Sequence, residues 1–315
     1  IGIVAVSVLA QAVKFTGTLI LLRRKFVRFR FRIDLKLSRY LFQTSLPFGI
    51  LLIIQTLQSQ LGTFVLSLYY DESTVGIYGA ATTIIMMLLY VPQAFASSIF
   101  PNYSRLYQES KAALTYFYRL AYKYLLVLGF PLALGTMLVG SNVVTLIYGE
   151  DFTGSAIVIQ IMGLFLFGLV GYTNGPLLQA TGRQRFFAWT QGGAALLNAV
   201  LCFVLVPPLG PVGAAVAFVT GGVLTFVVHS VACHRQLGLA MPWLLMGRVL
   251  LATAAMGLAV VLGIQIGLPW LLVAIGIAIP VYAGALFVLR IMKLDELKTL
   301  AGAPTPEHPL SETGA

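Results

Sequence analysis

The stretch GIYGAATTIIMMLLYVPQAFASSIFP, residues 76 to 101, contains no charged residue. A helix needs about 20 apolar residues to cross the hydrocarbon core of a bilayer. An α-helix also satisfies its backbone hydrogen bonds internally, as a lipid environment requires. Eight other stretches are long and mostly apolar: 1–22, 46–70, 121–148, 155–180, 185–206, 211–233, 242–264 and 268–292. The sequence therefore predicts an all-α polytopic membrane helix bundle with about nine transmembrane helices.

The composition supports this fold class. The 315 residues are 59% hydrophobic and only 10% charged, whereas charged residues make up about 25% of an ordinary soluble domain. The two cysteines, Cys202 and Cys233, fall near opposite ends of their predicted spans. They would lie on opposite sides of the membrane, so no disulfide is expected.

The positions of the charges predict the topology. Basic residues gather in alternate loops, and the intervening loops hold only acids or no charge. The loop after the first helix holds Arg23, Arg24, Lys25, Arg28, Arg30, Arg32, Lys36 and Arg39, and the acidic loops hold Asp71, Glu72, Glu150 and Asp151. By the positive-inside rule, the basic loops and the C-terminus face the cytoplasm. Topology thus explains the basic residues, and no nucleic-acid partner is expected.

Nine spans with a cytoplasmic C-terminus place residue 1 outside. We therefore expect an odd number of helices upstream, with residues 1–22 as the last helix of an N-terminal lobe. Residues 23–45 would form a basic cytoplasmic loop, 46–233 a six-helix C-terminal lobe, 242–292 an accessory helix pair and 293–315 a disordered tail. The segment 102–120, rich in tyrosine and basic residues, is predicted to lie as an interfacial helix.

The first helix carries an unusual polar face. Ser7, Gln11, Lys14 and Thr18 recur at helical spacing, so they share one side. At about 1.5 Å per residue, Lys14 lies on the order of 13 Å inside the cytoplasmic edge. None of the ten acidic residues falls within a predicted span. Lys14 must therefore pair with an upstream helix, reach water, or face a cavity that receives an anion, and we favour the cavity.

The second helix adds polar residues near its midpoint. Gln55, Gln58 and Gln60, with Ser59 and Thr63, are too many for a lipid-facing helix. They would line the same cavity, although hydrogen bonds between helices would also explain them. Arg248 lies inside its predicted span, where it either faces the cavity or snorkels to the surface. The candidate substrate-binding residues are Lys14, Gln11, Gln55, Gln58, Gln60 and Arg248.

Other features of the spans favour bending and packing. Pro92, Pro131, Pro280 and the segment 171–176 predict broken or bent helices. Small residues at 191–195 and 210–218 predict close helix packing. Asn174, Gln179 and Asn198 suit either helix–helix hydrogen bonds or a polar path.

Enzyme functions fit poorly. The predicted external loops are short and hold few acids, and no HExxH, GxSxG, CxxC or Walker motif occurs. We therefore expect a protein that is not an enzyme and needs neither cofactor nor metal. A pump driven by ATP through this chain alone is excluded, so energy would come from a gradient or from downhill use of the substrate.

Six motifs occur in the order seen in a known family. They are SLPFGI (45–50), LYYDESTVGIYGAA (68–81), VPQAFASSIFPNYSRLY (91–107), LIYGEDFTGSA (146–156), LLQATGRQR (177–185) and LLNAVLCFVLVPPLGPVGAAVA (196–217). In these motifs the chain resembles the polysaccharide (O-antigen type) flippases of the multidrug, oligosaccharidyl-lipid and polysaccharide exporter superfamily. The resemblance covers about residues 1–292.

The resemblance implies two six-helix lobes around a cavity, with an accessory pair for a total of 14 helices. It implies translocation of a polyprenyl-diphosphate-linked oligosaccharide across the cytoplasmic membrane by alternating access, with glycan polymerases or glycosyltransferases as partners. Lys14 would attract the diphosphate. Family members often carry an acid where this chain has Gly62, so cation coupling through that position is not expected. A proton- or sodium-coupled multidrug exporter and a scaffold subunit are the alternatives.

Overall fold

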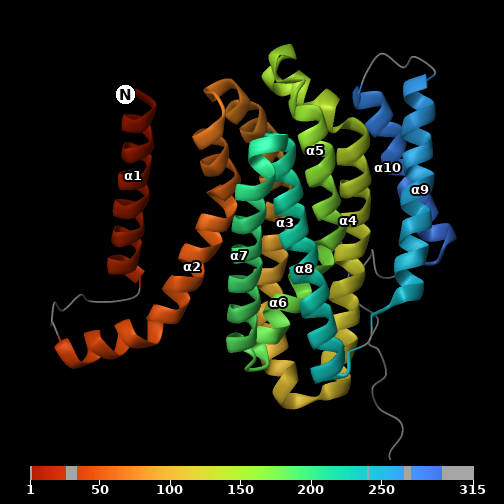
Figure 1. Ribbon diagram of the computed structural model, residues 1–315. Helices are drawn as coiled ribbons and strands as arrows, with labels where there is room; N and C mark the ends of the chain where they lie inside the picture. Colours follow the sequence, from red (N-terminus) through yellow and green to blue (C-terminus); the bar gives the residue numbers. More distant parts are fainter. Residues whose placement is uncertain (1, 26–33, 240, 266–270, 293–315) are drawn as a thin grey trace, which may run out of the picture. The chain divides into compact units, whose positions relative to one another are not determined.

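A computed structural model describes residues 2–25, 34–239, 241–265 and 271–292, and all of the elements within them are helical (Figure 1). The chain divides into two compact units, Ile1–Ile50 and Leu51–Ala315, which are described separately below. The predicted tail, 293–315, lies outside the described residues.

The first unit contains α1 (Gly2–Lys25) and the beginning of α2 (Leu35–Tyr69). The hydroxyl of Thr18 donates to the carbonyl of Lys14 at 2.8 Å, so this polar side chain is satisfied within α1. The Asp34 carboxylate accepts from the backbone N–H groups of Lys36 (2.9 Å) and Leu37 (3.2 Å). An acidic N-cap of this kind starts a helix. Helix α2 therefore begins well before residue 46, and part of the predicted basic loop 23–45 is helical.

The second unit holds the remaining helices. They are α3 (Glu72–Glu109), α4 (Lys111–Tyr148), the short 3₁₀ helix η1 (Glu150–Phe152), α5 (Ser155–Gly163), the 3₁₀ helix η2 (Leu164–Val170), α6 (Gly171–Ala180), α7 (Gln184–Leu209), α8 (Pro211–Leu237), α9 (Trp243–Gln265) and α10 (Leu271–Val288). Six segments of the described chain are long and apolar enough to cross a membrane. They are 72–109, 111–148, 155–180, 184–209, 211–237 and 243–263. The predicted all-α membrane fold is confirmed.

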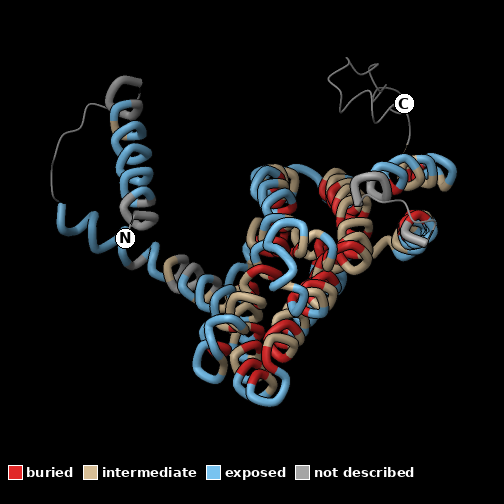
Figure 2. Tube along the Cα trace, turned by 90° about the horizontal axis from the view of Figure 1, so that it is seen from above, coloured by how far each residue is buried: buried red, intermediate tan, exposed pale blue. Residues whose placement is uncertain are grey.

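The core of the second unit lies between the helices (Figure 2), where α3, α4, α5, η2 and α8 supply most of the fully buried side chains. Cys202 and Cys233 are both buried and free. At the other extreme, many large apolar side chains on the outer helix faces are exposed, for example Leu146 and Trp189. Such surfaces suit contact with lipid chains.

The predicted break at 171–176 is found slightly earlier. Helix α5 gives way to the 3₁₀ segment η2 before α6 begins at Gly171. Against this segment, a Cβ at Gly129 of α4 would lie 3.0 Å from the Leu166 carbonyl oxygen, so glycine permits the close approach. By contrast, α3, α4 and α10 continue as helices through Pro92, Pro131 and Pro280.

The two predicted small-residue seams have different outcomes. At 210–218, Ala214 and Ala215 are fully buried, and a Cβ at Gly213 would overlap the backbone of Leu205. This seam packs α8 against α7, as predicted. At 191–195, the predicted seam is wrong in part, because Gly192 and Gly193 face open space.

The predicted interfacial helix at 102–120 is wrong. Ser110 has extended backbone dihedrals, which end α3 and start α4, and its hydroxyl accepts from the Ala113 N–H at 3.3 Å. The segment is thus the junction of two long helices. Tyr103 and Tyr118 from this segment are fully buried in the core rather than placed at a surface.

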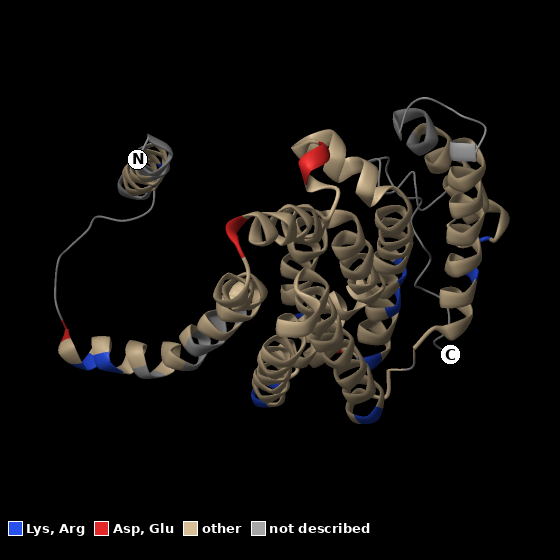
Figure 3. Cartoon of the chain, turned by 45° about the horizontal axis from the view of Figure 1, so that its top comes forward, with Lys and Arg blue, Asp and Glu red and all other residues tan. Residues whose placement is uncertain are grey.

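Charges within the second unit are segregated. The acidic residues at the start of α3 and in η1 lie at one end of the helices (Figure 3). Lysine and arginine gather toward the other end, where α3 meets α4 and α6 meets α7. This distribution matches the alternation of loop charges in the sequence.

Candidate functional site

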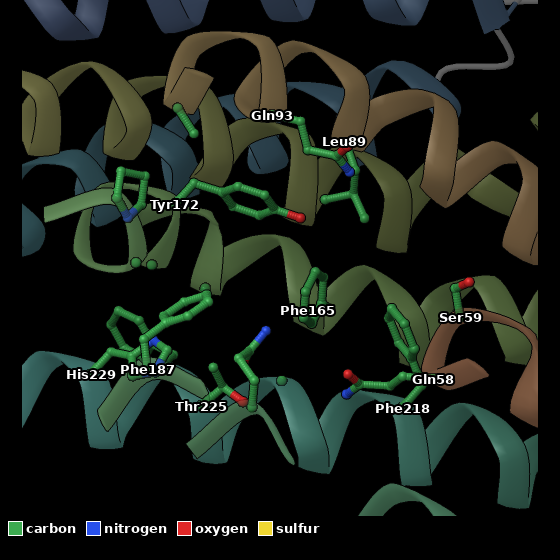
Figure 4. A pocket seen from close by; sticks show the side chains of 18 of the residues that line it. Gln58, Ser59, Leu89, Gln93, Phe165, Tyr172, Phe187, Phe218, Thr225 and His229 are labelled. Carbon is green, nitrogen blue, oxygen red and sulfur yellow. The ribbon is translucent and has the colours of Figure 1, made fainter. Parts of the chain in front are cut away.

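A pocket of about 460 Å³ lies within the second unit, between α2, α3, α7, α8 and the η2–α6 segment (Figure 4). Its volume is within the range of roughly 300–1,000 Å³ that is usual for small-molecule sites. The lining residues are Gln58, Ser59, Met86, Leu89, Gln93, Ala96, Ser97, Phe165, Gly168, Gly171, Tyr172, Gly175, Pro176, Gln179, Phe187, Gln191, Phe218, Gly222, Thr225, Phe226 and His229.

Amides provide most of the polar surface of this pocket. Four of the lining residues are glutamines, and none is Lys, Arg, Asp or Glu. The side chains of Gln58 and Gln191 form no hydrogen bond with the described residues, whereas Gln179 donates weakly to the Gly175 carbonyl at 3.4 Å. Tyr172 and Gln93 add a hydroxyl and a further amide to the pocket lining (Figure 4). The pocket thus offers both donors and acceptors without a net charge.

His229 of α8 is the most constrained polar group in the pocket. It is 3% exposed, its Nε2 lies 2.7 Å from the Thr190 hydroxyl of α7, and its ring stacks on Phe187 with centroids 5.2 Å apart. The same hydroxyl lies 3.0 Å and 2.9 Å from the carbonyls of Phe186 and Phe187. These contacts fix both the position and the plane of the imidazole.

Glycines make room for the aromatic rings. A Cβ at Gly222 would overlap the Phe165 ring, and a Cβ at Gly175 would lie 3.1 Å from the Phe187 ring. Phe165 in turn packs on Phe218, with centroids 4.9 Å apart. The glycines thus leave space for these rings, which line the pocket.

The predicted site residues fall in different places. Gln58 lines the pocket, together with its neighbour Ser59. Gln60 and Arg248 are exposed on α2 and α9 and are not among the lining residues. The side chain of Gln55 lies outside the described residues.

Gln11 and Lys14 are exposed on α1, in the first unit. The pocket belongs entirely to the second unit. A joint cavity that includes Lys14 therefore stays a prediction.

Several pocket residues were missed by the sequence analysis. Gln93, Tyr172, Gln191 and His229 all line the cavity. His229 and Gln93 could have been found as polar residues within the predicted spans 211–233 and 76–101. Gln191 was interpreted only as part of a packing seam.

A second polar cluster behind the pocket is structural. Asn174 of α6 accepts from the Tyr118 hydroxyl at 3.0 Å and donates to the Ser230 hydroxyl at 2.9 Å, and all three residues are buried. The helix-joining interpretation of Asn174 is therefore the one that the geometry supports. Among the described residues, no three His, Cys, Asp or Glu side chains gather in a way that could hold a metal.

Gly62 of α2 has no room for a side chain. A Cβ there would overlap the hydroxyl of Tyr78, which is itself buried in α3. The tyrosine thus occupies the space in which an acid at this position would lie.

Comparisons with known proteins agree with this architecture. A family described as "Polysaccharide biosynthesis protein" matches residues 2–157. A "Probable low-salt glycan biosynthesis flippase Agl15" from Haloferax volcanii is 25% identical over 170 residues, which cover 53% of this chain and 36% of that protein. The chain thus spans about a third of this curated relative.

Two solved structures share the fold. The lipid II flippase MurJ in an inward closed conformation has a TM-score of 0.69 at 15% identity, covering 85% of this chain and 58% of that one. A transporter of the MOP superfamily from Pyrococcus furiosus has a TM-score of 0.55 at 16% identity, covering 70% and 53%. The two sequence matches agree with the predicted resemblance to the polysaccharide flippases, and the two solved structures share the fold.

Proposed function

We propose that the chain is part of a flippase that moves a polyprenyl-diphosphate-linked oligosaccharide across the cytoplasmic membrane by alternating access. The observation that carries the proposal is the pocket of amides and aromatic rings, which lies inside a bundle of helices long and apolar enough to span a membrane. The match of residues 2–157 to a family of polysaccharide biosynthesis proteins supports it. A glycan needs hydrogen-bonding partners along its path, and the free amides of Gln58 and Gln191 supply them.

The charged part of such a substrate needs a different partner. In this proposal Lys14, on the polar face of α1, attracts the diphosphate, and the basic ends of the helices face the cytoplasm with the C-terminus. Glycan polymerases or glycosyltransferases would supply and consume the substrate. The O-antigen type of glycan is part of this proposal.

Reconstituted transport tests the proposal. The protein is placed in proteoliposomes, and movement of a fluorescent polyprenyl-diphosphate oligosaccharide between leaflets is recorded for the wild type, Lys14→Gln and the matched control Lys36→Gln. We expect transport by the wild type and by the control, and at least a tenfold loss in Lys14→Gln.

The other outcomes have distinct meanings. Normal transport by Lys14→Gln would remove the diphosphate role from this lysine and leave the flippase proposal standing. No glycolipid transport by the wild type under proton and sodium gradients, together with extrusion of a cationic dye, would replace the flippase with a drug exporter. A scaffold subunit would transport neither the glycolipid nor the dye, and its function would not depend on Lys14, so Lys14→Gln would have no effect.

A further inference from the structure

The electrostatics of the pocket limit what it can hold. The described lining residues offer no cation to a carboxylate or phosphate and no carboxylate to a cation. A charged group that leaves water for such a site loses its hydration without gaining a partner. An uncharged ligand avoids this loss, so the pocket favours neutral groups.

The hydrogen-bonding groups favour a ligand rich in hydroxyls. Each free amide, Gln58 and Gln191, offers a donor and an acceptor. The rings of Phe165 and Phe187 add apolar surface to the same pocket (Figure 4). A pyranose combines the same two features, because its hydroxyls lie around a ring whose C–H faces are apolar.

The contacts of His229 define its free nitrogen. The Thr190 hydroxyl has one proton, and the carbonyls of Phe186 and Phe187 and the Nε2 atom of His229 all lie within hydrogen-bonding distance of it. In each case Nε2 is engaged with Thr190, and Nδ1 is the ring nitrogen left for a ligand, as an acceptor when Nε2 carries the proton and as a donor when it does not. Nδ1 has no partner among the described residues. Among the side-chain nitrogen and oxygen atoms of these residues, only the Tyr103 hydroxyl is both fully enclosed and without a partner. Nδ1 of His229 is therefore not fully enclosed, and His229 lines the pocket.

We propose that the pocket binds one uncharged sugar unit of the transported glycan and that His229 is a specificity-determining residue, whose Nδ1 forms a hydrogen bond with a sugar hydroxyl. This inference rests on the proposed function and restricts the class of glycan that the flippase would carry. It assigns neutral sugars to the second unit and predicts that acidic sugars bind poorly there.

Direct binding tests the inference without transport. The protein in lipid nanodiscs is studied by saturation-transfer NMR with three probes: methyl glucoside, N-acetylglucosamine and glucuronate. We expect saturation transfer to the two neutral sugars and at least a fivefold weaker signal for glucuronate. Equal signals for all three would overturn the charge selectivity.

Variants locate the binding. His229→Leu should weaken the signal of the neutral sugars at least fivefold, and His234→Leu, in the exposed last turn of the same helix, should leave it unchanged. His229→Asn keeps a hydrogen-bonding amide near the position of Nδ1 and should restore part of the signal. Gln191→Leu should also weaken binding, while Gln160→Leu, outside the pocket, should not. Because Gln191 is not part of the His229 contacts, it serves as the test if His229→Leu fails to fold.

The two proposals can fail separately. Neutral sugars that bind in a His229-dependent way, without glycolipid transport, would support the pocket and overturn the flippase. Transport that is equal for neutral and acidic glycolipids and unchanged in His229→Leu would support the flippase and overturn the pocket. No binding of either neutral sugar, even at tens of millimolar concentration, would also overturn the inference.

Discussion

The Tyr118 hydroxyl donates a 3.0 Å hydrogen bond to the side-chain oxygen of Asn174, which joins α4 to α6 in the fully buried centre of the second unit. The amide nitrogen of Asn174 continues the connection to Ser230 of α8 at 2.9 Å. Because His229 precedes Ser230, this connection also helps to hold the wall of the pocket in place.

Replacing Asn174 should therefore destabilise the bundle. Asn174→Leu leaves two buried hydroxyls unpaired, and we expect a loss of about 1–3 kcal/mol in the free energy of unfolding. Adding Tyr118→Phe should recover part of that loss, because one orphaned hydroxyl is then removed. Denaturation in detergent checks this, with the exposed Asn142→Ala as control. A double variant that is less stable than Asn174→Leu would contradict the account.

Gly62 and Tyr78 give a second prediction. Gly62→Ala places a methyl group against the Tyr78 hydroxyl, and overpacking of this kind typically costs about 1–3 kcal/mol. Tyr78→Phe should relieve the overlap, so the double variant should melt at a higher temperature than Gly62→Ala. Gly79→Ala, which meets open space, is the control and should be neutral or stabilising. Unchanged melting of Gly62→Ala would show that Tyr78 moves aside easily.

Asp71 predicts a pH-dependent contribution to stability. The Thr74 hydroxyl (2.5 Å) and the Thr74 backbone N–H (3.2 Å) both donate to its carboxylate, and these hydrogen bonds lower the pKa of Asp71 from its ordinary value of 3.8. A lowered pKa in the folded state stabilises the protein above about pH 4, and this contribution is lost as the pH falls through the folded pKa. Asp71→Ala should therefore lower the melting temperature at pH 7, and the difference should shrink toward pH 3. Asp151→Ala, exposed in η1, is the control. A difference that stays constant with pH would exclude the carboxylate as the cause.

Arg183 ties the turn between α6 and α7 to the end of α8. Its Nε donates to the Gln236 side chain at 2.7 Å, and a terminal nitrogen donates to the Gln236 carbonyl at 3.2 Å. Lysine cannot form both bonds from one plane. Arg183→Lys should lower the free energy of unfolding by about 0.5–1.5 kcal/mol, and Arg185→Lys should have no effect. Faster amide hydrogen exchange near Leu237 in Arg183→Lys would show that the end of α8 is less well held. Unchanged exchange would argue against a stabilising role for the Arg183–Gln236 bonds.

The sequence allowed the helices to be predicted but not the pocket. A long uncharged stretch satisfies its backbone hydrogen bonds in lipid as a helix, so the sequence predicts a membrane-spanning helix at residues 76–101. Helix ends were harder, because Asp34 and Ser110 set them through local capping rather than through hydropathy. The role of His229 depends on Thr190, a contact between residues of different helices, and no pattern along the chain encodes that distance.

The burial of both cysteines has a practical consequence. A water-soluble maleimide reacts with accessible thiols, so the native chain should give almost no background labelling. A cysteine placed at Ser97 or Gln191, both in the pocket wall, would then be the single reactive position. Comparing reagents added to either side of sealed vesicles would reveal which compartment the pocket opens to, and whether that access reverses when substrate is present.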